Sequence, residues 1–126
     1  MMAFIAPYYL TKFSLSSGAD ALRQELFKVT KNVHVSIMEL GGYHTGFNQK
    51  MIARKYEWMK EDSYFNGVIE NVRAQEERFF NRTELKSTKT AVDAIVRAAE
   101  SDKTKLRYVA PRWQGAIVQL RRTLGK

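Results

Sequence analysis

The sequence contains no cysteine, only two prolines and no long hydrophobic run. Without cysteine the chain has no disulfide framework, no thiolate metal site and no cysteine nucleophile. No apolar run approaches the roughly 20 residues that span a bilayer, because charged residues or Asn interrupt each of them. The apolar start of the chain has no basic leader and no small-residue cleavage pattern of the secretory type. We therefore expect a cytoplasmic protein without a membrane segment.

The charge is strongly basic, with 21 Lys and Arg against 13 Asp and Glu in 126 residues, a net charge of +8. The basic residues are nevertheless dispersed among acidic ones, and only 50–60 and 121–126 are dense in positive charge. Nucleic-acid modules usually concentrate their charge on one face with aromatic platforms. We expect a solvated basic surface and no nucleic-acid partner; steep salt dependence of binding would favour the alternative, a phosphate-binding face.

The first predicted element is a helix over 7–28, started by Pro7. A four-and-three spacing places one stripe on a single face: Tyr8, Lys12, Leu15, Ala19, Leu22 and Leu26. A second stripe contains small residues, Ser14, Ser17, Gly18 and Ala21. Because Gly18 lowers helix stability by about 1 kcal/mol relative to Ala, we expect this face to meet another helix closely.

β-Branched residues predict a strand over 33–40, which the glycine pair 41–42 ends. A helical insertion over 47–82 follows. Its first helix uses Phe47, Met51, Tyr56 and Met59, and its second is capped by Asp62 or Ser63, with Phe65, Val68, Ile69, Val72 and Phe79 inward.

Residues 88–110 read as a helix and a last strand, and 112–124 as a terminal helix. Thr88 is the expected cap of the first of these, which buries Val92, Ile95, Val96 and Ala99. A strand, a helix and a second strand usually form a parallel crossover. Two strands make a narrow sheet with an open edge. We therefore expect a single incomplete α/β domain, the partial Rossmann-like end of a doubly wound parallel sheet, completed by association.

Tyr8 and Lys12 are the candidate chemical pair, since residues four apart on a helix share a face. An ammonium about 4 Å from a phenolate stabilises it by about 4 kcal/mol at an effective dielectric near 20, before desolvation. That effect suits a tyrosine to acid and base catalysis. On spacing alone, a lysine that reaches solvent beside a packed tyrosine is the more common arrangement.

The surrounding residues resemble the short-chain dehydrogenase/reductase family. Tyr8-Tyr9-Leu10-Thr11-Lys12 and the residues up to Leu26 resemble its active-site helix, and Val33 to Thr45 resembles its next strand and its Pro-Gly-x-x-x-Thr loop. Residues 91–99 and 107–109 are similar to its last helix and strand. The resemblance covers nearly the whole chain in family order.

This resemblance implies NAD(P)-dependent hydride transfer between an alcohol and a carbonyl. Tyr8 would exchange the proton, and Lys12 would assist it and hold the nicotinamide ribose. Gly41 would keep the loop close to the cofactor, and Thr45 would contact the nicotinamide or pyrophosphate end. Residues 47–81 would form a substrate lid, whose apolar content (Phe47, Met51, Trp58, Tyr64 and Phe65) weakly indicates an apolar substrate.

The sequence also departs from the family pattern at several positions. No G-x-x-x-G-x-G loop occurs, the family's catalytic serine and active-site asparagine would lie upstream of this chain, and Leu40 replaces the usual proline. Such a chain lacks the glycines and the helix N-terminus that cradle a dinucleotide. We therefore expect a C-terminal half that is inactive alone and binds no NAD or NADP by itself.

The alternative from another class is a non-catalytic domain that forms homo-oligomers through the 8–28 helix and the open strand edge. We expect a dimer or larger in either case. His34 and His44 have no acidic partners at metal-site spacing, so both are expected to be structural or surface residues.

Overall fold

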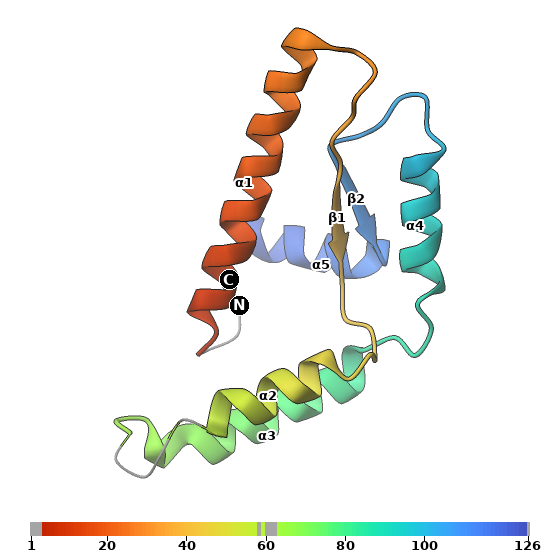
Figure 1. The fold of residues 1–126 in the computed structure, drawn as a ribbon. Helices are drawn as coiled ribbons and strands as arrows, with labels where there is room; N and C mark the ends of the chain where they lie inside the picture. Colours follow the sequence, from red (N-terminus) through yellow and green to blue (C-terminus); the bar gives the residue numbers. More distant parts are fainter. Residues whose placement is uncertain (1–3, 58, 60–62, 126) are drawn as a thin grey trace. The chain divides into compact units, whose positions relative to one another are not determined.

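The computed structural model describes residues 4–57, 59 and 63–125 (Figure 1). The described chain is mixed α/β, with five helices and a two-stranded parallel sheet. The elements are, in order, α1 (Ala6–Val29), β1 (Ile37–Leu40), α2 (Phe47–Glu57), α3 (Asn66–Thr83), α4 (Lys89–Ala99), β2 (Arg107–Ala110) and α5 (Arg112–Thr123). None of the helices in these residues is long and apolar enough to cross a membrane.

The chain forms two compact units. One consists of Met1–Tyr9 and Gly42–Ser87, and the other of Leu10–Gly41 and Thr88–Lys126. The boundary runs through α1, whose first turn belongs to the first unit. The first unit is called here the hairpin unit and the second the sheet unit.

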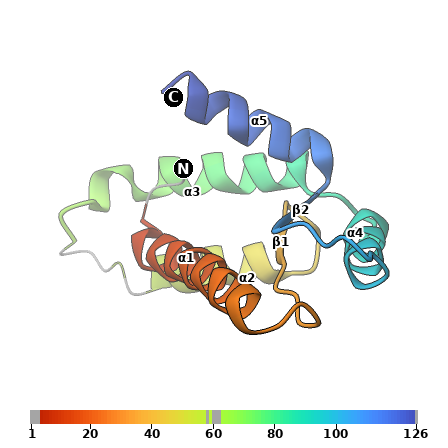
Figure 2. The same ribbon diagram turned by 90° about the horizontal axis from the view of Figure 1, so that it is seen from above.

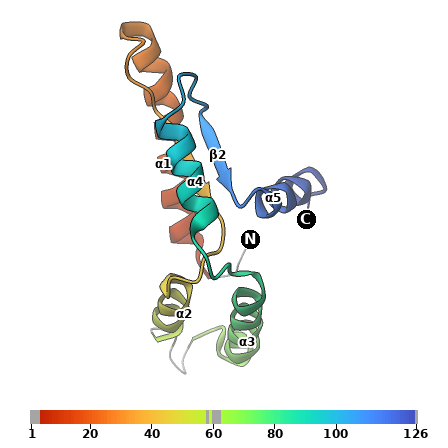
Figure 3. The same ribbon diagram turned by 90° about the vertical axis from the view of Figure 1, so that its right-hand side faces the viewer.

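In the sheet unit, β1 and β2 pair in parallel, with Ile37 opposite Arg107 and Leu40 opposite Ala110. The helix α4 connects the two strands and packs against both, as the crossover pattern predicts. Figure 2 shows the strands from above with α4 beside them, and Figure 3 shows α5 turning away from the end of β2. The parallel strand–helix–strand prediction is confirmed.

A glycine permits the close packing of α5 against β2. A Cβ at Gly115 would lie 2.3 Å from Cγ1 of Val109, closer than any real contact. The turn between strand and helix is formed by Pro111, which follows a cis peptide bond. Arg107 ties the sheet together, since it donates to Glu39 Oε1 at 2.6 Å across the strands and to Ser16 Oγ of α1 at 2.9 Å.

In the hairpin unit, α2 and α3 lie side by side (Figure 3). Their facing apolar residues form a small core of Ile52, Tyr56, Ile69 and Phe80. Phe4 and Met51 pack against this core, and the ring of Phe4 lies 4.9 Å from that of Phe65. Apolar burial between two amphipathic helices explains why this part of the insertion folds as a hairpin.

Two predicted element starts are wrong. Residues 33–36 are not part of the strand, because β2 begins only opposite Ile37 and the carbonyl of Val35 accepts from Arg23 instead. Ser63 does not cap α3. Phe65 is the N-cap, and its backbone N–H donates to the Ser63 hydroxyl at 3.3 Å. Asp62 lies outside the described residues. Thr88 is the N-cap of α4, without a side-chain hydrogen bond.

Several residues predicted to be buried are exposed. On α4, Val92, Ile95 and Val96 are 43–52% exposed, whereas Ala91 and Ala94 are buried. The same holds for the α1 stripe, which has no buried residue, and for Phe47, Phe65, Val68 and Phe79. The buried face of α4 is that of Ala91 and Ala94 and not the predicted one, and the predicted faces have no covering layer in the described chain.

Candidate functional site

Tyr8 and Lys12 lie one turn apart on α1, as predicted. Tyr8 is 38% exposed, and its ring lies 6.3 Å from that of Phe47 and 6.1 Å from that of Tyr9. The contact with Phe47 brings Tyr8 beside the end of the loop that precedes α2. Lys12 is exposed and belongs to the sheet unit.

Gly41 and Thr45 lie at opposite ends of the segment between β1 and α2. Gly41 belongs to the sheet unit, where a Cβ would meet Gln114 Oε1 at 1.9 Å and Pro111 Cδ at 3.0 Å. The space at Gly41 is therefore used by the start of α5. Thr45 belongs to the hairpin unit, is exposed, and its backbone N–H donates to Tyr43 O at 2.9 Å. Gly46 has a φ of +79°, which turns the chain into α2.

A buried carboxylate lies beneath this loop, and the sequence analysis missed it. The side chain of Glu84 is 2% exposed and is surrounded by donors from the loop and from the first turn of α2: His44 Nδ1 at 2.7 Å, Asn48 Nδ2 at 2.7 Å and Gln49 Nε2 at 3.0 Å. Burial raises the pKa of Glu84, but the hydrogen bonds from Asn48, Gln49 and His44 outweigh it and hold the pKa below its ordinary value.

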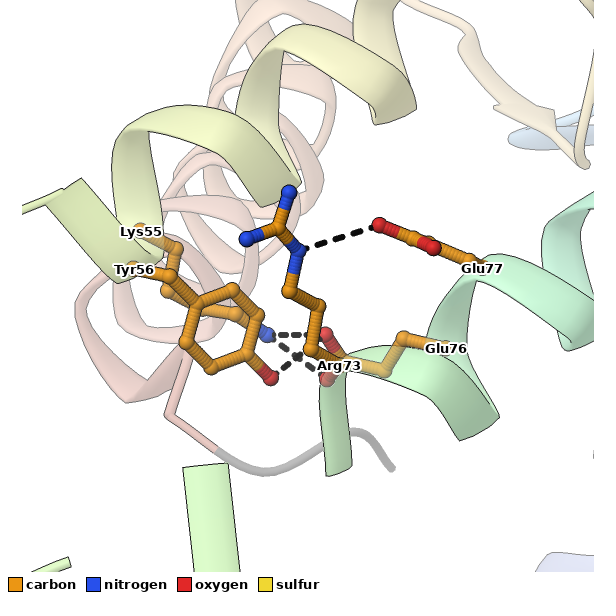
Figure 4. Close-up of polar contacts among 5 residues, drawn as sticks. All are labelled: Lys55, Tyr56, Arg73, Glu76 and Glu77. Atoms are coloured by element: carbon orange, nitrogen blue, oxygen red, sulfur yellow. Dashed lines mark hydrogen bonds and ion pairs between the residues drawn. The ribbon is translucent and has the colours of Figure 1, made fainter. Parts of the chain in front are cut away.

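A second buried polar cluster connects the last turn of α2 with the middle of α3 (Figure 4). Lys55 Nζ donates to both oxygens of Glu76, at 2.6 and 2.5 Å, and both side chains are less than one-tenth exposed. The Tyr56 hydroxyl donates to the same carboxylate at 3.0 Å. Burial, followed by the bond to Glu76, raises the pKa of Tyr56 above its ordinary value. These contacts link α2 to α3.

An open hollow of about 210 Å³ lies between α2 and α3 and is lined by Gln49, Ile52, Ala53, Arg73, Glu77, Phe80 and Asn81. None of the four predicted site residues lines it. Gln49 Oε1 is buried without a hydrogen-bond partner among the described residues. Of the expected lid residues, Tyr64 is 95% exposed, and Trp58 lies outside the described residues.

Helix α1 and an edge of β1 are two of the surfaces that the sheet unit leaves uncovered in the described chain. Helix α1 is tied to the rest of the unit by polar contacts, since Arg23 donates to the carbonyls of Val35 and Thr104. Its large apolar residues are all partly or largely exposed, including Leu10, Phe13, Leu15, Leu22 and Phe27. Nothing lies within 4 Å of a Cβ placed at Gly18, so the close approach expected there is not found in the described chain.

The second uncovered surface is an edge of β1. Ile37 and Gly41 donate to the carbonyls of Leu106 and Ala110 on the β2 side. Since alternate residues of a parallel strand point their backbone groups to opposite sides, those of Met38 and Leu40 point to the other edge. No further strand pairs with that edge in the part of the chain that the structure describes.

The two histidines differ in their surroundings. His34 is exposed and contacts Phe27 edge-on, at 6.4 Å between ring centroids. His44 is paired with Glu84, forty residues away in sequence. Residues 4–57, 59 and 63–125 contain no group of three His, Cys, Asp or Glu side chains arranged to hold a metal ion. The sequence carried no local signal for the Glu84 contacts, because the partner is distant along the chain.

No protein-family model, no curated protein and no solved structure matches this chain.

Proposed function

We propose that this chain is the C-terminal portion of a short-chain dehydrogenase/reductase-like oxidoreductase, with Tyr8 as the proton-transferring residue. The reaction is NAD(P)-dependent hydride transfer between an alcohol and a carbonyl. The observation that best supports the proposal is the order of elements, in which a helix with Tyr8 and Lys12 precedes two parallel strands joined by α4. In chain order, the helical hairpin between β1 and α4 falls where the resemblance expects a substrate lid.

The uncovered surfaces of the sheet unit support the same proposal. A parallel sheet normally has several strands and helices on both faces. Here the β1 edge and the apolar residues of α1 and α4 lack such neighbours in the described chain. A dinucleotide-binding half that contributed strands and helices would cover them. This half would also supply the glycine loop and the catalytic serine that the sequence lacks.

In this reaction Tyr8 protonates the developing alkoxide, or accepts the proton in the reverse direction. Lys12 lies one turn away on α1 and would assist the proton transfer and hold the ribose hydroxyls of a bound dinucleotide. Thr45, in the loop before α2, would contact the cofactor. The cofactor itself supplies the hydride chemistry when bound.

The first test is a calorimetric titration of the 126-residue chain with NADH and then NADPH. We expect no binding heat, because the chain has no glycine-rich cradle. The chain is then tested with the dinucleotide-binding half of a short-chain dehydrogenase/reductase, supplied separately or fused ahead of residue 1. This assembly is called here the complemented protein. Dinucleotide oxidation is followed with aldehydes and ketones.

Variants of two neighbouring tyrosines identify the catalytic one in the complemented protein. Tyr8→Phe should lower kcat at least a hundredfold, in the range of a lost general acid. Tyr9→Phe removes the adjacent hydroxyl as a matched control and should leave kcat within about twofold. Lys12→Met should lower activity, whereas Lys28→Met at the other end of α1 should not. Equal activity of Tyr8→Phe and Tyr9→Phe would remove Tyr8 from the mechanism.

A second candidate function is a non-catalytic domain that forms homo-oligomers. The observation that favours it is the exposed small-residue face of α1, together with the open β1 edge. We expect the wild-type chain to form a dimer or larger species, with Gly18→Leu shifting it to a smaller mass in light scattering. Under this candidate, Tyr8→Phe and Tyr9→Phe behave alike and the complemented protein is inactive.

A further inference from the structure

The loop between β1 and α2 is joined to the segment that follows α3. Tyr43 and Leu85 form an isolated parallel bridge. Leu85 N donates to Gly42 O at 3.0 Å, and His44 N donates to Leu85 O at 2.9 Å. The backbone of the loop therefore runs beside the exit of α3.

The carboxylate of Glu84 adds a side-chain connection at the same place. Glu84 directly follows α3, His44 belongs to the loop, and Asn48 and Gln49 form part of the first turn of α2. All three of these side chains bond to Glu84, as described above. One buried side chain thus connects three segments of the hairpin unit.

The burial of this carboxylate makes its donors important. A carboxylate removed from water is strongly unfavourable unless hydrogen bonds replace its hydration. The two amides and the imidazole supply that replacement only while the loop and the start of α2 keep their present positions. Glu84 therefore favours one path of the loop over others, and Thr45 lies on that path between His44 and Gly46.

We infer that Glu84 is a positioning residue for the proposed cofactor site, holding the 42–46 loop and with it Thr45 in place at the base of the lid. Glu84 has no bond to Thr45 and acts through His44, Asn48 and Gln49. The purpose assigned to the loop rests on the proposed function, whereas its attachment to Glu84 rests on the contacts alone.

The attachment is tested with Glu84→Gln in the full chain, labelled with ¹⁵N. The change keeps the size of the side chain but replaces one acceptor oxygen with an NH₂ group that faces other donors. We expect the Thr45 amide resonance to shift and the exchange protection of the His44 and Leu85 amides to fall at least tenfold. The Ile69 amide, in the core between α2 and α3, should keep its protection.

Two further variants keep this test decisive. Glu77→Gln makes the same change on the exposed face of α3 and should alter none of these signals. His44→Ala removes one donor from a largely exposed side chain and should reproduce a smaller part of the change even where Glu84→Gln fails to fold. Unchanged Thr45 and Leu85 signals in folded Glu84→Gln would overturn the inference.

The role toward the cofactor is tested in the complemented protein. Glu84→Gln should raise the KM for the dinucleotide at least tenfold and change kcat less than threefold, since Tyr8 is untouched. A displaced loop with an unchanged KM would overturn the positioning role. If the complemented wild-type protein has no dinucleotide-dependent activity, the proposed function and the cofactor role fall together, while the amide data still decide whether Glu84 holds the loop.

Discussion

Lys55 on α2 and Glu76 on α3 form an ion pair in which the ammonium bonds to both carboxylate oxygens and both side chains are buried. A buried pair of this kind contributes little net stability over apolar residues, because both charges lose their hydration. Replacement of only one partner by an apolar residue leaves the charge of the other buried without a counter-charge. Loss of either partner alone is therefore expected to weaken the packing of α2 against α3.

Lys55→Met should lower the free energy of unfolding by about 3–5 kcal/mol, because Glu76 would remain buried without its cation. Urea denaturation at pH 7 measures the change. Lys50→Met, on an exposed part of the same helix, should change it by less than about 0.5 kcal/mol.

The combined variant Lys55→Met, Glu76→Leu and Tyr56→Phe removes the whole buried cluster. It should recover most of the stability lost in Lys55→Met, because no unpaired polar group remains. A combined variant less stable than Lys55→Met would show that the cluster is itself strongly stabilising.

Tyr56 should keep its proton above the pH at which a free tyrosine ionises. Burial and the bond to Glu76 raise its pKa above the ordinary value, so its neutral form is favoured in the folded chain. The contribution of protonated Tyr56 to the stability of the folded chain is fully present below about pH 10, and it is lost as the pH rises above that value. Absorbance titration near 295 nm should show that Tyr56 ionises only as the chain unfolds, and Tyr56→Phe should remove that absorbance step.

Glu84 should make the hairpin unit less stable in acid. Its folded-state pKa is lowered, so its contribution is fully present above its unfolded pKa of about 4.3 and is lost as the pH falls through the lower folded value. The midpoint of unfolding, measured between pH 7 and pH 3, should therefore fall more steeply with decreasing pH for wild type than for Glu84→Gln. Parallel curves for the two proteins would contradict this assignment, and Glu77→Gln should follow wild type.

Two helical glycines should respond oppositely to the same substitution. Gly115→Ala should destabilise the chain by about 1–3 kcal/mol, because the new methyl group would overlap Val109. Gly18→Ala should stabilise it by up to about 1 kcal/mol, because nothing lies near and Ala favours the helix. Thermal unfolding of the two variants at equal concentration measures both effects.

The elements could be predicted from the sequence because each has its own periodicity. The bounds predicted for the first and last helices, 7–28 and 112–124, agree with α1 and α5 to within one residue, and the order of helices and strands is confirmed. The strand over 33–36 was wrong because β-branched residues such as Val33 favour a strand only where a partner exists, and β2 is too short to provide one.

Burial and long-range contacts could not be predicted in the same way. An apolar stripe such as Val92 and Val96 identifies the apolar face of a helix. It does not show whether the same chain contains an element that packs against that face. The bonds of His44 to Glu84 and of Lys55 to Glu76 join residues 40 and 21 positions apart. Their pairing depends on tertiary structure, which no local pattern encodes.

The bridge between Tyr43 and Leu85 means that the polypeptide enters and leaves the α2–α3 hairpin at nearly the same point. A segment with adjacent ends can be lengthened, shortened or replaced without requiring the strands outside it to move. We therefore expect that residues 43–85 can be exchanged between chains of this architecture as one segment, without a change in the pairing of β1 with β2.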